Sequence, residues 1–372
     1  GGDVDEQDPG LHLVDVLPAG AGGAHGTQGE GVNLSVSDKL RIAERLDAFG
    51  VHYIEGGWPG ANPKDIEFFR IIKTIPLKHA TVIAFGSTRK ASHSVRKDPN
   101  LQALLAAETK TITLFGKTWS LHVTDALGIS LAKNLELIGD SVAHLRSKGR
   151  RVFYDAEHFF DGYKNNPSYA LKTLHAAQEA KADWVVLCDT NGGTLPDEIQ
   201  LIIDEMKKKI STPLGIHVHN DSEMAVANTI VAVKKGIRLV QGTINGYGER
   251  TGNCNLTSVI PTIALKMNRK CLPGSSLRKL KEISQFVDEI ANIRHDPRQP
   301  WVGQTAFAHK GGIHVAAMRR NSSSYQHVDP ELVGNHMAVV VSELSGRGNL
   351  LSKAEEHGMD TSNVGTVGEV LS

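Results

Sequence analysis

Short apolar runs recur along the chain, one roughly every 30 residues. They are rich in Val, Ile, Leu and Thr and lack the polar alternation of a half-exposed strand. This pattern is typical of strands that are buried on both faces. The eight runs occupy residues 11–16, 52–57, 81–86, 111–116, 151–157, 184–190, 215–220 and 239–245.

The segments between these runs have the apolar spacing of amphipathic helices. We predict that the helix in 36–50 has Ser37 as its N-cap and ends at Gly50, and that the next helix starts with Pro63. Eight strands alternating with helices predict an α/β fold, a closed (β/α)₈ TIM barrel. A doubly wound open sheet is the alternative, and the regularity of the units favours closure. Further helices are expected in 130–149, 167–182, 196–209 and 222–236.

The rhythm of the chain changes after about residue 272. The 372 residues exceed one barrel of about 250 residues, so we expect an appended unit. Residues 1–10 are interpreted as a disordered tail and residues 11–270 as the catalytic barrel. Residues 271–372 are expected to form a small, mostly helical subdomain, with one amphipathic helix over 276–293.

Composition excludes several classes of partner. The 41 basic and 41 acidic residues balance, so no surface for nucleic acid is expected. No apolar stretch approaches the roughly 20 residues that span a bilayer, and the acidic start does not resemble a signal peptide. The three cysteines lack CxxC spacing, which favours a reducing compartment, and we therefore expect a cytoplasmic protein.

Candidate chemistry lies where the predicted strands end, because these ends converge on one face of a barrel. Glu157 closes the fifth run, and Thr190 follows Asp189 at the end of the sixth. His217 and His219 are two residues apart, so both can point into the barrel mouth and bind one divalent ion.

The glycine-rich loop after the eighth run also carries polar candidates. Asn253 follows glycines that let the backbone approach a ligand, and its neutral oxygen suits a hard ion. Glu249 and Arg250 either act on a ligand or brace the loop as an ion pair. In isolation, His314 and Tyr325 in the appended region are weak signals.

Seven motifs together resemble the citramalate synthases, close relatives of the 2-isopropylmalate and homocitrate synthases. The resemblance runs from about residue 11 to about residue 355. It implies a metal-dependent TIM-barrel acyltransferase of isoleucine-type, branched-chain amino-acid biosynthesis. The motifs are "GTQGEGV", "YIEGGWPGANPKDIEFF", "YDAEHFFDGYK", "CDTNGG", "HVHND", "GERTGN" and "FAHKGGIHV…YQHVDPELVGN…SELSGR".

The resemblance implies a Claisen-type condensation of acetyl-CoA with pyruvate, giving citramalate and CoA. A divalent ion (Mn, Mg or Zn) polarises the keto group of the oxo acid, and a base removes a proton from the thioester methyl group. The appended subdomain often serves the partner's site, which implies a homodimer. By this resemblance, His217, His219 and Asn253 match metal ligands, Glu157, His314 and Tyr325 match catalytic residues, and Gln28 and Thr190 match substrate-binding residues.

One segment departs from the family pattern "LYDTTLRDGTQGEG". Aligned backwards from Gly26, Ala24 replaces a catalytic arginine and His25 replaces a metal-binding aspartate. Two imidazoles and an amide provide no anionic ligand, although His25 can supply a third imidazole suited to zinc. Three explanations stay open: an error in the reading frame, a protein with lost activity, or an altered metal site that uses His25.

Other functions are also compatible with the sequence. A 2-isopropylmalate synthase would act on 2-oxoisovalerate, and an impaired barrel would bind a ligand or partner without turnover. A lyase acting on an acyl-CoA is a further option. Family enzymes usually continue into a regulatory domain, and this sequence stops at Ser372, so we expect no such domain and no feedback inhibition through it.

Overall fold

The computed structural model describes residues 10–17, 32–309, 317–318, 320–321 and 324–339. His25, Gln28 and His314, for which the sequence predicts roles, lie outside these ranges. The described residues separate into two compact units, one of residues up to 273 with 286–293, and one of 274–285 with the residues from 294 on. Each unit is described by itself.

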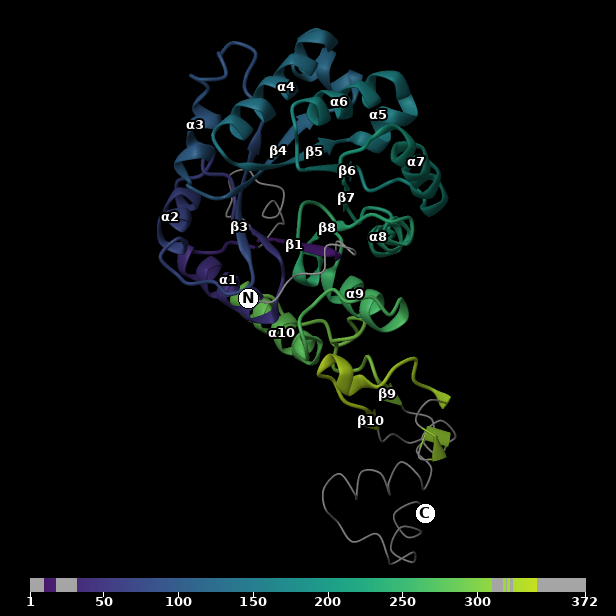
Figure 1. Cartoon of the computed structure of the whole chain (residues 1–372). Helices are drawn as coiled ribbons and strands as arrows, with labels where there is room; N and C mark the ends of the chain where they lie inside the picture. The colour runs from purple at the N-terminus through teal and green to yellow at the C-terminus, as the bar shows by residue number, and fades with distance from the viewer. Residues whose placement is uncertain (1–9, 18–31, 310–316, 319, 322–323, 340–372) are drawn as a thin grey trace, which may run out of the picture. The chain divides into compact units, whose positions relative to one another are not determined.

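Eight parallel strands close into a barrel, in which each strand pairs with its neighbour in sequence and β1 pairs with β8 (Figure 1). The predicted TIM barrel is therefore confirmed, and the open sheet is excluded. Each strand falls within or next to one of the eight apolar runs. The strands are β1 (His12–Val16), β2 (Tyr53–Glu55), β3 (Thr81–Ser87), β4 (Thr111–Lys117), β5 (Arg151–Glu157), β6 (Trp184–Asp189), β7 (Leu214–Val218) and β8 (Leu239–Gly242).

Helices surround the ring of strands, as Figure 1 shows. Three of them, α3, α5 and α9, lie in segments for which the apolar spacing predicted no helix. The helices are α1 (Val36–Phe49), α2 (Pro63–Ile72), α3 (Pro99–Ala106), α4 (Leu131–Ser147), α5 (Phe159–Asn165), α6 (Pro167–Glu179), α7 (Pro196–Lys209), α8 (Ala225–Lys234), α9 (Leu256–Pro261) and α10 (Leu280–Ile290). Among the described residues, no helix combines the length and apolar character needed to cross a membrane.

The N-cap of α1 differs from the prediction. Ser35, not Ser37, starts the helix: its Oγ accepts a hydrogen bond from the backbone N–H of Asp38, and the Asp38 carboxylate accepts one from the N–H of Ser35. This reciprocal pair satisfies two donors that a helix start leaves open. The predicted end is confirmed, because Gly50 has a φ of 95°, which closes the helix at little steric cost.

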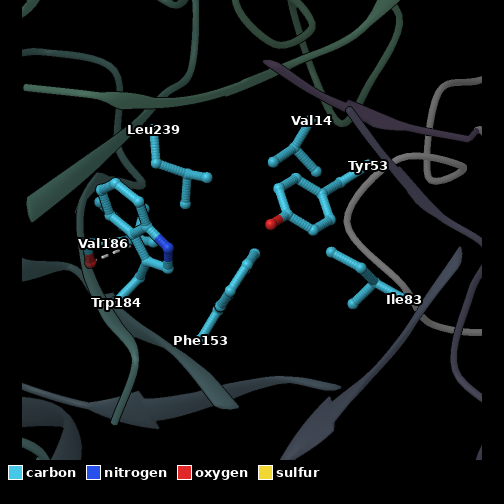
Figure 2. Close-up of a cluster of buried hydrophobic side chains, with 8 residues drawn as sticks. Val14, Tyr53, Ile83, Phe153, Trp184, Val186 and Leu239 are labelled. Carbon is cyan, nitrogen blue, oxygen red and sulfur yellow. Dashed lines mark hydrogen bonds between the residues drawn. The ribbon is translucent and has the colours of Figure 1, made fainter. Parts of the chain in front are cut away.

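The barrel interior has an apolar layer beneath a polar one. Figure 2 shows side chains of the apolar layer pointing toward one another. The ring centroids of Tyr53 and Phe153 are 5.2 Å apart, and those of Phe153 and Trp184 are 6.4 Å apart. Because residues two apart in a strand share a face, the polar Asp155 and Glu157 follow Phe153 on the interior face of β5. The polar layer therefore lies at the carboxyl ends of the strands, where TIM-barrel active sites form.

The second unit contains a short parallel sheet, in which β9 (Ala308–His309) pairs with β10 (Ala338–Val339). Asn335 connects its loops by donating hydrogen bonds to the carbonyls of Trp301 and Gly303, at 3.0 and 2.9 Å. The helix expected over 276–293 is shorter than predicted: a 3₁₀ turn (Ser276–Lys279) precedes α10.

Candidate active site

A pocket opens at the carboxyl ends of the barrel strands. It brings together four residues that the sequence singled out: Glu157, Thr190, His217 and His219. It also contains side chains that the sequence reasoning missed, among them Glu55 and Asp155. The described residues that line it are Glu55, Phe85, Phe115, Asp155, Glu157, Cys188, Thr190, His217 and His219.

The two histidines of β7 and its end are buried side by side, with ring centroids 5.1 Å apart. Nδ1 of His217 lies 2.8 Å from Oε1 of Gln241, whose Nε2 donates to Asp155 at 3.0 Å. Because Gln241 uses its N–H toward Asp155, its oxygen accepts from His217, and the His217 proton lies on Nδ1. The Nε2 lone pair of His217 is thus the one suited to a cation.

Arg250 braces the loop beside His219. Its guanidinium contacts both carboxylate oxygens of Asp221, at 2.7 and 2.8 Å, and donates to the carbonyl of Thr190 at 2.7 Å. Glu249 is a more distant partner, at 3.6 Å. Nη2 of Arg250 also lies 3.1 Å from Nδ1 of His219. Since a guanidinium only donates, this nitrogen accepts here, and cation binding by His219 would require the contact to rearrange.

Asn253 is positioned next to His219, with which it forms an isolated β-bridge. Its side chain is buried, and neither its oxygen nor its nitrogen has a hydrogen-bond partner among the described residues. A buried amide in this state carries a large desolvation cost unless a ligand satisfies it. The backbone makes room for it: Gly248 has a φ of +159°, and a Cβ there would lie 2.5 Å from Oδ1 of Asn253.

These residues fit a divalent cation in part. Among the residues that the structure describes, no three His, Cys, Asp or Glu side chains are arranged to hold a metal. The described donors are therefore the two imidazoles and the orphaned amide oxygen of Asn253, a set of nitrogen and oxygen ligands that Zn²⁺ or Mn²⁺ accepts. Further ligands would come from outside them, and His25 is the candidate that the sequence names.

The two polar residues at neighbouring strand ends have defined partners. Glu157 is buried and forms an ion pair of 2.6 Å with Lys117 at the end of β4. Thr190 is also buried, and its Oγ accepts a hydrogen bond from the backbone N–H of His158. Tyr325 belongs to the second unit, where its side chain is 45% exposed.

Glu55 is the least expected member of the pocket. It ends β2, is 4% exposed, and its Oε2 has no hydrogen-bond partner among the described residues. Burial, and then the negative charge of Asp155, raise the pKa of Glu55 to about 8. Asp155 could have been predicted, because it lies two residues before Glu157 on β5 and therefore shares its face. Glu55 and Gln241 gave no such signal, because they lie within runs interpreted as apolar.

Two aromatic residues, Phe85 and Phe115, line the pocket at β3 and β4, and Trp58 packs against them. Phe85 and Phe115 are stacked with centroids 5.2 Å apart, and Trp58 packs edge-on against both. The backbone N–H of Trp58 donates to Asp65, whose other carboxylate oxygen accepts from the buried Lys39 at 2.6 Å. This ion pair therefore anchors the loop that carries Trp58.

Comparison with known sequences gives this geometry a family. The sequence model described as HMGL-like matches residues 24–287, and one described as homocitrate synthase post-HMGL domain-like matches residues 301–369. The chain belongs to the HMGL-like family. Family membership agrees with the closed barrel and with a separate unit that follows it.

Relatives within the HMGL-like family confirm the resemblance to citramalate synthases. The chain is 59% identical to an (R)-citramalate synthase of Geobacter sulfurreducens over 331 residues, which are 89% of this chain and 63% of the relative. It is 53% identical to an (R)-citramalate synthase of Aquifex aeolicus, and the match covers 90% of this chain and 64% of the relative. A homocitrate synthase of Methanopyrus kandleri is 32% identical, covering 90% and 81%. The chain thus spans less than two thirds of the two citramalate synthases.

Solved structures share the fold of this HMGL-like chain. An HMG-CoA lyase of Bacillus subtilis superposes with a TM-score of 0.64 at 17% identity, over 76% of this chain and 94% of the lyase. The carboxyl transferase domain of Rhizobium etli pyruvate carboxylase, solved with pyruvate, gives a TM-score of 0.57 at 14% identity, over 78% and 49%. At these identities the likeness concerns the barrel alone.

Proposed function

We propose that the protein condenses acetyl-CoA with pyruvate to give citramalate and CoA, as in isoleucine-type biosynthesis. The observation that supports this proposal is the difference in sequence identity between its groups of relatives. Identity is 49–59% to five (R)-citramalate synthases, and 32% to a homocitrate synthase and to a probable 2-isopropylmalate synthase. Pyruvate is therefore a better candidate than the larger 2-oxoisovalerate.

The proposed roles follow the family resemblance and agree with the polar layer of the pocket. Thr190 lies on the lining and carries a hydroxyl that can hold the oxo-acid carboxylate. Glu157, which pairs with Lys117, lies on the same lining. We assign it a role next to the reacting carbon, as the family resemblance implies. The full set comprises Glu157, His314 and Tyr325 as catalytic residues, Gln28 and Thr190 for the substrate, and His217, His219, Asn253 and His25 for the metal.

When bound, a divalent cation polarises the keto group of pyruvate and stabilises negative charge that develops on its oxygen. Gln241 holds the proton of His217 on Nδ1, so Nε2 is the nitrogen of His217 that suits the cation. Asn253 contributes an amide oxygen with no other partner among the described residues. We also propose a homodimer, in which the second unit supplies Tyr325 and His314 to the partner's site.

The test is release of free thiol when the chain is incubated with acetyl-CoA, Mn²⁺ and pyruvate. We expect release with pyruvate and far less with 2-oxoisovalerate, and its loss in the His217→Ala variant. Glu205→Ala, which removes an exposed residue of α7, is the matched control. Release with 2-oxoisovalerate alone would assign the chain to the isopropylmalate synthases.

A second function is favoured by Ala24 and His25, which replace a family arginine and aspartate. Loss of one such positive donor costs about 10²–10³-fold in rate, so the chain would bind metal and pyruvate without appreciable turnover. Calorimetric titration separates the two functions, because binding without thiol release indicates an impaired barrel. The double variant Ala24→Arg, His25→Asp should then restore thiol release.

A further inference from the structure

A second cavity lies where β6, β7 and β8 begin, at the end of the barrel opposite to the candidate active site. Its volume of about 300 Å³ has room for about ten non-hydrogen atoms, at the roughly 30 Å³ that a water-sized group occupies. The described residues that line it are Trp184, Lys207, Ile210, Thr212, Pro213, Leu214, Gly236, Ile237 and Arg238.

The floor of this cavity is apolar. Trp184 and Leu214 are buried at the start of their strands, and Trp184 also belongs to the apolar layer of the barrel. The main chain nearby is already paired: the N–H of Arg238 donates to the carbonyl of Leu214 at 3.3 Å, and the carbonyl of Pro213 accepts from the N–H of Val185 at 3.0 Å. A ligand here would therefore bury carbon, and side chains would have to recognise its polar end.

Two cationic side chains line the same cavity. Nζ of Lys207 donates to the carbonyl of Lys235 at 2.7 Å, which leaves two of its N–H groups for a ligand. This ammonium lies over the lining residue Gly236, where a Cβ would be 3.1 Å from Nζ. The guanidinium of Arg238 has no hydrogen-bond or ion-pair partner among the described residues. No described lining residue is acidic, so the cavity is complementary to an anion.

We propose that this cavity binds a small carboxylate with an apolar body of about ten non-hydrogen atoms. The apolar body lies against Trp184 and Leu214, and the carboxylate is held by Lys207 and Arg238. An α-amino acid is a poorer ligand, because its ammonium would lie beside two cations. The site is independent of the proposed reaction, since none of the residues with a proposed role in that reaction lines it.

The experiment is calorimetric titration of the full chain with phenylacetate, which has about ten non-hydrogen atoms. We expect saturable binding with a Kd of about 1–10 mM. Phenylacetamide has the same shape without the charge, and phenylalanine adds an ammonium. Both should bind about fivefold or more weakly than phenylacetate.

Variants locate the bound carboxylate. Binding should change the tryptophan fluorescence in the unmodified chain and in Trp58→Phe, but not in Trp184→Phe. Arg238→Gln and Lys207→Gln should each weaken binding by about threefold to fivefold. Lys209→Gln is the matched control, because Lys209 belongs to the same last turn of α7 and does not line the cavity.

Three results would overturn this assignment: no saturable binding of phenylacetate, equal affinity for phenylacetamide, or unchanged affinity in both Arg238→Gln and Lys207→Gln. A fluorescence change that disappears in Trp58→Phe instead would place the ligand in the other pocket and would also overturn it. Thermal unfolding identifies any variant that fails to fold, and the comparison with phenylacetamide in the unmodified chain then decides. Thiol release from acetyl-CoA is measured separately, so failure of either proposal leaves the other standing.

Discussion

The imidazole of His217 and the side-chain amide of Gln241 are joined by a hydrogen bond of 2.8 Å between Nδ1 and Oε1. Gln241 of β8 is fixed in turn by a hydrogen bond to Asp155 of β5. The contact sets the tautomer of a proposed metal ligand through a residue that is not itself a ligand.

Gln241→Met should therefore weaken binding of Mn²⁺ by about 10–100-fold, since His217 loses the group that orients it. Calorimetric titration with Mn²⁺ measures the effect. Gln102→Met, at an exposed glutamine of α3, is the matched control and should leave the affinity unchanged. Equal affinity in both variants would show that the contact with Gln241 does not prepare His217 for the cation.

At Asn253, one substitution is expected to raise the affinity for a divalent cation. Asn253→Asp places an anionic oxygen where the described residues offer only a neutral one, so affinity for a divalent cation should rise by about tenfold. Asn253→Ala removes the donor and should lower the affinity by a similar factor. Both are read from the same titration, and a fall in affinity for the aspartate variant would argue against a cation next to this side chain.

His52 predicts a loss of stability in acid. Its Nδ1 accepts a hydrogen bond from the N–H of Leu13, and burial, together with the nearby His12, lowers its pKa to about 4. Below pH 6.5 His52 is protonated in the unfolded chain but stays neutral in the folded chain. The free energy of unfolding therefore falls as the pH decreases to about 4 and then levels off. The shift corresponds to about 3 kcal/mol, which partial solvent exposure reduces to roughly 1–2 kcal/mol.

Urea unfolding between pH 7 and pH 4 measures this effect. His52→Asn keeps an acceptor for Leu13 but has no proton to gain, so its stability should change less over the same interval. An unchanged pH dependence in this variant would assign the acid sensitivity to other groups.

The buried ion pair of Lys39 and Asp65 predicts a large effect of removing one partner. Lys39→Met leaves the Asp65 carboxylate buried without its cation and should lower the free energy of unfolding by about 3–5 kcal/mol. Arg70→Met, which breaks an exposed ion pair with Glu67, should cost less than about 1 kcal/mol. Urea unfolding of the two variants tests the contrast.

The sequence was sufficient for the barrel because each strand is a short apolar run of its own, whereas local chemistry was harder to assign. The cap of α1 was misplaced by two residues, since Ser35 and Ser37 have the same side chain and only Ser35 lies three residues before Asp38. Helix α3 was overlooked although Asp98 and Pro99 form a start signal.

Predictions for the site worked best at strand ends. Glu157, Thr190, His217 and His219 meet in one pocket because parallel strands end on one face. Glu55 escaped notice because a carboxyl group inside an apolar run gives no sign of which way it points. The roles of His25, Gln28 and His314 stay predictions, as they lie outside the described residues.

Because an apolar layer lies beneath the polar one, the side chains that stabilise the barrel are separate from those that bind and react with the substrate. Rings such as Tyr53, Phe153 and Trp184 hold the strands together at one level, and the reactive groups stand one step above them. Substitutions in the polar layer can change which oxo acid binds, while the apolar layer keeps the barrel closed. A laboratory search for new substrates is best confined to the polar layer, where sequence diversity is tolerated at least cost to folding.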